Sequence, residues 1–328
     1  MTSEDLLDAT GLVKTFQVQH RGLWRSSAET MRALDDVSLS VAPHESVAIV
    51  GESGSGKSTL ARVLMRLLDP DEGSVFFGGE DILAMPSADL RRVRPRFQMV
   101  FQNPYGSLNP RLPVGRSVVE AAVVHDKLRN QSAEALSESL LSRVGLSPKL
   151  ASRLPRELSG GQRQRVAIAR ALSVEPELLI ADEAVSALDL PVQAQILNLL
   201  ESLRSQLGIA LIFISHQLPV VSHVADRVMV MYLGRVVEEG PIEDVFQAPA
   251  HPYTASLLAA QPGRHRHRAV GGIAGATSTV TTSVFELQQT GCAFRDRCPR
   301  AMKTCADIRP ALATVGDRHA VACHLPAS

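Results

Sequence analysis

The stretch Gly51-Glu-Ser-Gly-Ser-Gly56-Lys57-Ser58 decides the fold of this 328-residue chain. It fits the pattern G-x-x-x-x-G-K-[ST], in which glycines let backbone N–H groups turn inward around phosphates. An apolar run typical of a buried strand, Ser46 to Val50, precedes it. A helical pattern from Lys57 to Leu68 follows, with one apolar face made of Leu60, Val63, Leu64 and Leu67. Strand, loop and helix in this order favour a phosphate site over a glycine-rich turn with a chance lysine.

Each part of this loop has a chemical reason to be there. Lys57 supplies a point charge near the β- and γ-phosphates, and the Ser58 hydroxyl can ligate Mg²⁺. The helix N-terminus adds the positive end of its dipole. The sequence therefore predicts ATP and Mg²⁺ as ligands, with nucleotide contacts from Gly51, Ser53, Gly54, Ser55, Gly56, Lys57, Ser58 and Thr59.

Strand-like and helix-like runs alternate along the rest of the chain. Strands are expected at 98–101, 178–181, 209–214 and 227–232, and helices at 131–144, 162–172 and 192–207. This alternation predicts an α/β fold with a mostly parallel sheet covered by helices. The first 45 residues hold two short strand-like runs, 12–18 and 37–41, around a basic irregular segment with Trp24. We expect these two runs to form a small antiparallel sheet beside the core.

An apolar run from Leu178 to Ala181 ends in two carboxylates, Asp182 and Glu183. Ligands collect at the carboxyl ends of strands in an open parallel sheet. Asp182 can hold Mg²⁺, and Glu183 can orient or deprotonate an attacking water. A solvated strand end is the alternative for the pair alone, and the phosphate loop upstream favours the catalytic interpretation.

The composition limits where the chain can work. The 34 basic residues balance the 34 acidic ones, which argues against a chain-wide nucleic-acid surface. The acidic N-terminus does not resemble a signal peptide, and no apolar run approaches the roughly 20 residues that span a bilayer. We expect a soluble, cytoplasmic chain that reaches a membrane only through partners.

Four further segments resemble ABC ATPases. Leu158-Ser159-Gly160-Gly161-Gln162 matches their signature sequence, and Ser186-Ala187-Leu188-Asp189 is similar to their D-loop. His216 follows the expected strand that ends at Ile214, where the family has its switch histidine, and Gln102 resembles the Q-loop glutamine. The resemblance covers roughly residues 8 to 260, and it implies a P-loop NTPase of ABC type with a helical signature subdomain at about 103–172.

The resemblance implies a shared site between two such domains. ATP would lie between the loop of one domain and Ser159, Gly160, Gly161 and Gln162 of the other, with Asp189 nearby. His216 would contact the γ-phosphate, and Gln102 would sense Mg²⁺ and the attacking water. Phe16 resembles the aromatic residue that stacks on adenine, with a core aromatic of the small sheet as the alternative. Ala184 departs from the proline that most relatives carry there, and we expect activity to survive.

Three segments indicate a branch of the family. Residues 103–111, Asn-Pro-Tyr-Gly-Ser-Leu-Asn-Pro-Arg, and His251-Pro252-Tyr253 resemble the oligopeptide/dipeptide importers, and so does the tail from Gly291 to Pro326. We expect an ABC ATPase domain at 1–260, a linker at 261–290 and a cysteine-bearing extension at 291–328. The tract Arg264 to Arg268 is interpreted as a solvated linker, with metal or acidic lipid binding as the alternative.

All four cysteines lie in this extension, at Cys292, Cys298, Cys305 and Cys323. Four thiolates suit a tetrahedral Zn²⁺ or an iron–sulfur cluster, and the wide spacing lacks the paired C-x2-4-C knuckles of zinc folds. Some members of the branch carry a [4Fe–4S] cluster here. The sequence therefore favours [4Fe–4S], with Zn²⁺ and unmetallated thiols as alternatives.

The leading functional prediction is the ATPase subunit of a peptide-type ABC importer at the cytoplasmic face of the membrane. The implied partners are a second ATPase subunit (a copy or a paralogue), two transmembrane permease subunits and an extracytoplasmic substrate-binding protein. The rival is a soluble ABC ATPase acting on nucleic acid or ribosomes. Those relatives usually carry long insertions, whereas about 100 residues separate Ser58 from Leu158 here. A catalytically silent partner is disfavoured because the catalytic positions are intact.

Overall fold

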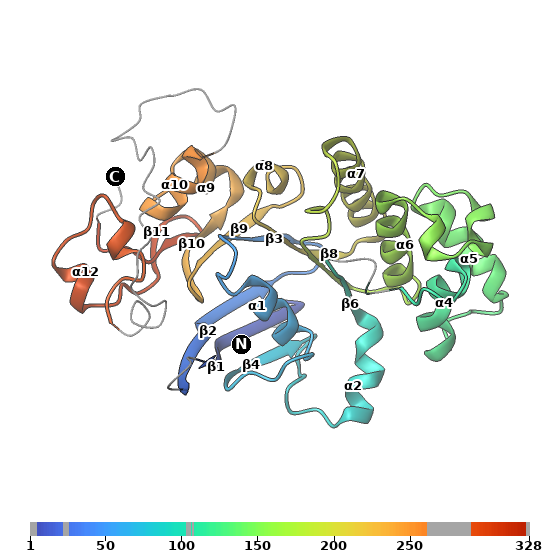
Figure 1. Cartoon of the computed structure of the whole chain (residues 1–328), viewed down its shortest axis with the longest axis horizontal. Coiled ribbons are helices and arrows are strands. Elements are labelled where there is room, and N and C mark those ends of the chain that lie inside the picture. The colour runs from blue at the N-terminus through green and yellow to red at the C-terminus, as the bar shows by residue number, and fades with distance from the viewer. Residues whose placement is uncertain (1–4, 22–25, 103–105, 107, 261–289, 326–328) are drawn as a thin grey trace.

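The computed structural model describes residues 5–21, 26–102, 106, 108–260 and 290–325. Several predictions fall outside these residues: those on Trp24, on most of 103–107, on the linker 261–290 apart from Thr290, and on Pro326. The described part is an elongated molecule with the helices α4 and α5 at one end and the cysteine-bearing extension at the other (Figure 1).

A large mixed sheet forms the centre of the fold. Its strand order is β11-β12-β10-β9-β3-β8-β7-β6. The five strands from β9 to β6 are parallel, and β10, β12 and β11 add antiparallel pairs at one edge. The strands are β3 (Ser46–Val50), β6 (Phe97–Val100), β7 (Leu178–Asp182), β8 (Ala210–Ser215), β9 (Arg227–Tyr232), β10 (Arg235–Pro241), β11 (Ala313–Gly316) and β12 (His319–Val321). The predicted α/β fold with a mostly parallel sheet is confirmed.

Helices cover the sheet because their apolar faces must be buried against it. The α-helices are α1 (Lys57–Leu64), α2 (Ser87–Val93), α4 (Val114–Val124), α5 (Ala133–Arg143), α6 (Gly160–Leu172), α7 (Leu190–Leu207), α8 (Leu218–Val221), α9 (Ile242–Gln247), α10 (Pro252–Ala259) and α12 (Thr304–Asp307). Short 3₁₀ turns are η1 (Arg94–Arg96), η2 (Pro148–Ser152), η3 (Pro155–Glu157) and η4 (Arg295–Arg297). Helices α4, α5 and α6 pack together as the predicted helical subdomain, to the side of the sheet (Figure 1).

Strand β3 shows how the sequence builds two apolar cores. Its side chains alternate between the faces of the sheet, as the period of a strand requires. Val47 and Ile49 join the core that also contains Leu60 of α1 and the N-terminal strands. Ala48 and Val50 join the other core, which contains α6 and α7. All five residues of β3 are buried, which explains why the four residues directly before the phosphate loop, Val47 to Val50, are all apolar.

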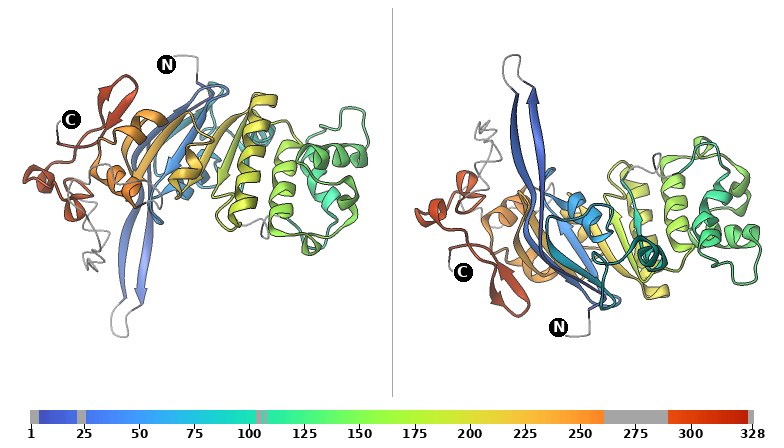
Figure 2. Two further views of the ribbon diagram at one scale, coloured as in Figure 1. Left: turned by 90° about the horizontal axis from the view of Figure 1, so that it is seen from above. Right: turned by 90° about the horizontal axis from the view of Figure 1, so that it is seen from below.

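The N-terminal antiparallel sheet is confirmed, but its strands are much longer than predicted. The order is β2-β1-β4-β5, with β1 at Leu7–Arg21, β2 at Ser26–Val41, β4 at Glu72–Phe77 and β5 at Glu80–Asp81. Strands β1 and β2 pair as far as Arg21 and Ser26, and this hairpin projects from the body of the molecule (Figure 2). The prediction of an irregular segment between two short strands was wrong. Backbone pairing continues where the polar sequence gives no apolar alternation.

Two helix boundaries also differ from the sequence prediction. Helix α1 ends at Leu64, and Arg66 then adopts a left-handed backbone with φ of 45°. Leu67 therefore leaves the apolar face and is 48% exposed, so its predicted place on that face was wrong. Helix α6 begins at Gly160 and not at Gln162, because Ser159 caps it.

The C-terminal extension joins the main sheet. Strand β12 pairs with β10 at Glu238↔Val321 and Glu239↔Ala320, and β11 pairs with β12. These short strands were not predicted because three or four polar and small residues give no detectable period. Among the described residues, no helix is long and apolar enough to cross a membrane.

Candidate nucleotide site

At two positions the phosphate loop adopts a backbone conformation that only glycine accommodates. Gly51 has φ of 155°, and a Cβ there would lie 2.2 Å from the carbonyl oxygen of Met231 at the end of β9. Gly56 has φ of 102°, and its Cβ would lie 2.3 Å from the carbonyl oxygen of Ala33. Gly56 also precedes α1 without a side-chain cap, so the first N–H groups of this helix face the loop. The geometry suits the binding of an anion.

Lys57 lies across this loop and is buried. Its Nζ donates hydrogen bonds to the carbonyl oxygens of Gly51 and Glu52, each at 2.8 Å, and to Ser55 Oγ at 3.3 Å. Burial lowers the pKa of Lys57, while the charges of Glu183, Asp182 and Glu52 oppose that shift. The ammonium group is thus held at the loop by acceptors that a phosphate can replace.

The carboxyl ends of four parallel strands bring the other predicted residues to the same edge. The loop follows β3, Gln102 follows β6, Asp182 ends β7, and His216 follows β8. Ser58 Oγ donates a hydrogen bond to Asp182 Oδ1 at 3.1 Å. Burial raises the pKa of Asp182, the bond from Ser58 opposes this, and the neighbouring charge of Glu183 adds to it. A hydroxyl and a carboxylate oxygen side by side form a donor set that fits Mg²⁺.

The carboxylate of Glu183, which follows β7, lies beside a residue that follows each of the two neighbouring strands, β6 and β8. Its Oε2 accepts a hydrogen bond from Gln102 Nε2 at 2.7 Å, and its Oε1 lies 3.4 Å from His216 Nδ1. Its own N–H donates to the carbonyl oxygen of Ile214 at 3.0 Å, and its φ is 45°, a left-handed conformation uncommon outside glycine. Strain of this kind gathers at functional sites. The carboxylate is partly exposed, as a group that must reach a water molecule needs to be.

Comparison with known proteins fits this geometry. The sequence profile "ABC transporter" matches residues 34–186, and the profile "Oligopeptide/dipeptide transporter, C-terminal region" matches residues 237–305. The probable peptide ABC transporter ATP-binding protein y4tS of Sinorhizobium fredii is 48% identical over 99% of this chain and 91% of its own length. The oligopeptide transport ATP-binding protein OppF of Salmonella typhimurium is 42% identical over 97% of this chain and 95% of its own.

The chain belongs to the family of ABC transporter ATP-binding proteins. A solved structure supports the same assignment. The dimeric ATP-binding cassette MJ0796 in a post-hydrolysis state with ADP and Pi is 29% identical, with a TM-score of 0.63, over 72% of this chain and 98% of that one. A second structure, cbiO1 of Clostridium perfringens, part of an ABC transporter complex, gives a TM-score of 0.61 at 29% identity.

The signature residues of this ABC ATPase lie at the start of α6, where two of them bond each other. Ser159 and Gln162 form a reciprocal capping box at the start of α6, with bonds of 3.0 and 3.3 Å. Gly160 and Gly161 lie in the first turn of α6, and a Cβ at Gly161 would come within 2.4 Å of Val192. The structure does not bring these four residues to the phosphate loop. Their role towards a second domain stays a prediction.

Two other predicted contacts have clear positions. Asp189 caps α7 by accepting a hydrogen bond from the N–H of Val192 at 2.9 Å. Phe16 lies on β1 and is 37% exposed, so the alternative of a core aromatic residue was wrong. Nearby, Asp71 accepts bonds from Lys14 and Thr15 that hold its pKa at about 2, which ties this part of β1 to the rest of the sheet. Phe16 is therefore accessible at the surface of β1, and its contact with adenine stays a prediction.

The four cysteines lie together in the extension but do not form a metal-ligating group. Burial raises the pKa of the Cys292 thiol, and the other three cysteines raise it further. The N–H of Cys292 bonds the carbonyl oxygen of Cys305 at 2.8 Å. Among the described residues, however, no three His, Cys, Asp or Glu side chains are arranged to hold a metal ion. The structure therefore gives the iron–sulfur prediction no support.

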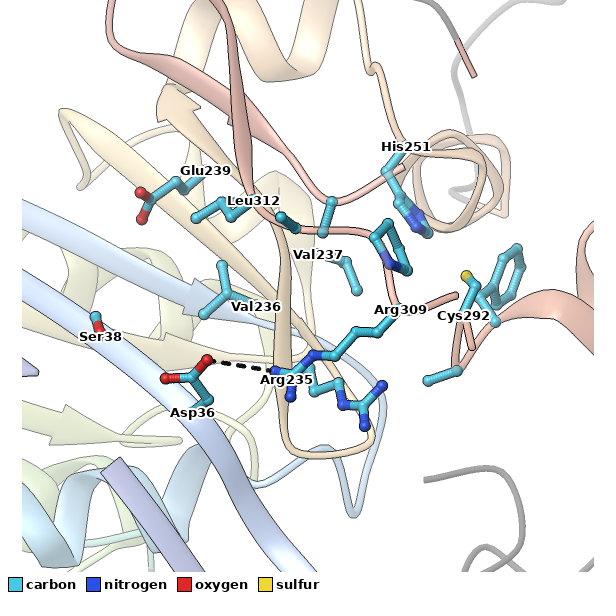
Figure 3. A pocket seen from close by; sticks show the side chains of 15 residues that line it. Asp36, Ser38, Arg235, Val236, Val237, Glu239, His251, Cys292, Arg309 and Leu312 are labelled. Carbon is cyan, nitrogen blue, oxygen red and sulfur yellow. Dashed lines mark ion pairs between the residues drawn. The ribbon is translucent and has the colours of Figure 1, made fainter. Parts of the chain in front are cut away.

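A cavity of about 270 Å³ is lined by residues of the extension and by residues of β2 and β10 (Figure 3). Arg309 of the extension crosses it to Asp36, at 3.8 Å, and pairs with Asp35 at 3.5 Å. Arg235 pairs with buried Asp35 at 2.6 Å. Burial opposes the ionisation of Asp35, but Arg235, Arg309 and Arg32 together outweigh it and lower the pKa. None of the predicted catalytic residues lines this cavity. It lies where the extension meets the main body of the fold and is not the nucleotide site.

Sequence reasoning missed Glu52 of the phosphate loop and the two residues outside the loop that contact it. The N–H of Glu52 donates to Tyr253 Oη at 2.9 Å, and the Glu52 carboxylate pairs with Arg297. Glu52 occupies a variable position of the loop pattern, and the other two lie some 200 residues or more along the chain. No spacing rule connects such positions, although His251-Pro252-Tyr253 did stand out as a branch marker.

Proposed function

We propose that this chain is the ATP-hydrolysing subunit of an ABC importer for peptides. The convergence of Gln102, His216 and Glu183 beside the loop carries the proposal for hydrolysis. The C-terminal region typical of oligopeptide and dipeptide transporters, and relatives named for peptide transport, support the substrate class. The rival, a soluble ABC ATPase acting on nucleic acid or ribosomes, has no support among these relatives.

In the proposed mechanism the loop binds the triphosphate first. Backbone N–H groups of Gly51 to Ser58 and the Lys57 ammonium contact the β- and γ-phosphates, Thr59 is a further nucleotide contact, and Phe16 stacks on adenine. Mg²⁺, when bound, would balance phosphate charge, and Ser58, Asp182 and Gln102 are the residues that would hold it.

Glu183 then serves as the base for hydrolysis. It takes a proton from water as the water oxygen bonds to the γ-phosphorus and the bond to the β–γ bridging oxygen breaks. His216 contacts the γ-phosphate and Gln102 orients the water from the opposite side of Glu183. The bonds seen from both residues to this carboxylate support its position for that task.

A second ATPase domain completes the site in this proposal. The N-terminus of α6 in that domain would present Ser159, Gly160, Gly161 and Gln162 to the γ-phosphate, with Asp189 at the same interface. The dimeric form of the structural relative MJ0796 supports pairing. Closure on ATP and reopening after hydrolysis would drive two transmembrane permease subunits, fed by an extracytoplasmic substrate-binding protein, at the cytoplasmic face of the membrane.

Purification of the tagged full-length chain from detergent-solubilised membranes tests this assignment. We expect two permease subunits and a second ATPase subunit to co-purify with it, and peptide uptake to fail in cells that carry only the Glu183→Gln chain. Co-purification with ribosomes or nucleic acid, without membrane subunits, would instead support the rival and contradict peptide import.

A metal cluster at Cys292, Cys298, Cys305 and Cys323 is a separate proposal that rests on the sequence alone. We predict that anaerobic purification gives brown protein with broad absorption near about 400 nm and bound iron and sulfide, as Cys₄ clusters do. Colourless protein with stoichiometric zinc, or with no metal, would contradict [4Fe–4S]. No step of ATP hydrolysis depends on this cluster. The domain division at 260 and 290 likewise remains a proposal, which limited proteolysis within 261–290 would test.

A further inference from the structure

Glu52, the second residue of the phosphate loop, is held at three polar groups at once. Its N–H donates to Tyr253 Oη at 2.9 Å, and its carbonyl oxygen accepts a bond from Lys57 Nζ at 2.8 Å. Its carboxylate accepts two hydrogen bonds from Arg297, both at 2.8 Å. The two external partners come from α10 and from the cysteine-bearing extension. A bidentate arginine–carboxylate pair fixes orientation as well as charge.

Arg297 is itself fixed by buried aromatic rings. Its guanidinium lies 5.7 Å from the ring centroids of both Tyr232 and Phe294. The rings of Tyr232, Tyr253 and Phe294 contact one another with centroids 4.6 to 5.4 Å apart, and Tyr253 is fully buried. The side chain of Arg297 remains 46% exposed, so water and salt still reach the pair with Glu52.

The docking of the extension keeps Arg297 in place. Buried Glu238 of β10 accepts bonds from the N–H groups of Ala250 and His251, at 2.7 and 3.0 Å. The same carboxylate pairs with His319 of β12 at 2.8 Å. One side chain therefore anchors both the start of α10, which carries Tyr253, and the extension, which carries Arg297. The contacts of Tyr253 and Arg297 with Glu52 thus both depend on Glu238.

The negative charge of Glu52 lies in the phosphate loop, and Arg297 neutralises it. Its carboxylate is close enough to Lys57 to act on the pKa of that ammonium. A negative charge at this point opposes the arrival of a triphosphate, which is itself a polyanion. Arg297 balances the charge of this carboxylate through two hydrogen bonds. Hydrogen bonding to Glu52 raises the pKa of Arg297 further above its ordinary value, so the cation persists.

We propose that Arg297 is a positioning residue for ATP binding, and that the cysteine-bearing extension thereby forms part of the nucleotide site. Arg297 neutralises and orients Glu52, while Tyr253 fixes the backbone of the same residue. This inference rests on the proposed binding of ATP at the loop. It assigns to the extension a role in the ATPase cycle of its own chain.

Titration of the full-length chain with a fluorescent ATP analogue in Mg²⁺ buffer tests this role. We expect Arg297→Ala to weaken nucleotide binding about three- to fivefold at low salt, the range that exposed ion pairs contribute, and to raise KM more than it lowers kcat. The loss should shrink at high salt, because screening weakens the effect of the unbalanced Glu52 charge. The matched control is Arg295→Ala, two residues away in η4, where the side chain bonds the carbonyl oxygen of Ala306 and does not contact the loop.

The decisive variant combines Arg297→Ala with Glu52→Gln. Removing the unbalanced charge should return the affinity towards that of the wild type, a rescue that general damage to the extension would not allow. Tyr253→Phe provides a second route, since it keeps the ring and removes only the acceptor for the Glu52 N–H, and we expect it to weaken binding as well.

Two results would overturn the proposal: an Arg297→Ala chain that binds like the wild type at low salt, or a double variant as weak as Arg297→Ala alone. Either result, with tight binding by the wild type, leaves the ATPase assignment intact. Absence of nucleotide binding by the wild type would contradict the proposed function itself.

Discussion

Replacement of Glu183 by glutamine is expected to abolish ATP turnover and to leave ATP binding intact. Glutamine preserves the size of the side chain and can still bond Gln102, but it cannot accept a proton from water. General base catalysis contributes about a hundredfold to ten-thousandfold, so we expect kcat to fall by at least about a hundredfold. Release of inorganic phosphate measures turnover, and equilibrium titration with ATP measures binding.

Glu201→Gln is the matched control for this substitution, because Glu201 lies on the exposed face of α7, away from the site. It should hydrolyse ATP like the wild type. A Glu183→Gln chain that releases phosphate at the wild-type rate would show that another group activates the water. A chain that fails to bind ATP would show that Glu183 has a structural role in the nucleotide pocket.

Replacement of Lys57 by alanine is expected to weaken ATP binding itself. The Lys57 ammonium is the buried cation of the loop, and no other lysine lies within the loop pattern. Loss of hydrogen bonds to charged groups costs about 1.5–3 kcal/mol, which corresponds to about a 10- to 100-fold weaker affinity. Calorimetric titration with ATP and Mg²⁺ measures this change.

Lys149→Ala, on an exposed 3₁₀ turn, serves as the control, and the thermal unfolding temperature of Lys57→Ala shows whether the loop still folds. Unchanged affinity in a folded Lys57→Ala chain would mean that the triphosphate does not contact this ammonium group. The assignment of the loop as the binding site would then be wrong.

The nucleotide site could be predicted largely from sequence because its parts are local. The glycines, lysine and serine of the loop lie on one continuous segment between a buried strand and a helix, so their relative positions follow from backbone geometry. Asp182 and Glu183 follow from a second rule, since they stand at the carboxyl end of a parallel strand. Gln102 and His216 were predicted from the resemblance to ABC ATPases, and they follow the two strands beside β7. Topology alone then brings them to one edge.

Features built by polar or distant segments could not be predicted in the same way. The β1–β2 hairpin continues to Arg21 without an apolar period, so its length depends on pairing between backbones and not on a burial pattern. The attachment of β12 to β10 and the contact of Arg297 with Glu52 join residues more than 80 positions apart. Such contacts depend on tertiary packing of Phe294 and Tyr253, which no local pattern encodes.

Phosphate release by the complex that co-purifies with the tagged chain tests the central claim most directly. The claim is that the edge formed by the loop, Asp182 and Glu183 hydrolyses ATP. We predict Mg²⁺-dependent release of phosphate by the wild-type complex and none above background by the complex that carries Glu183→Gln. Equal rates from the two complexes, or no release by a wild-type complex that binds ATP, would contradict the account.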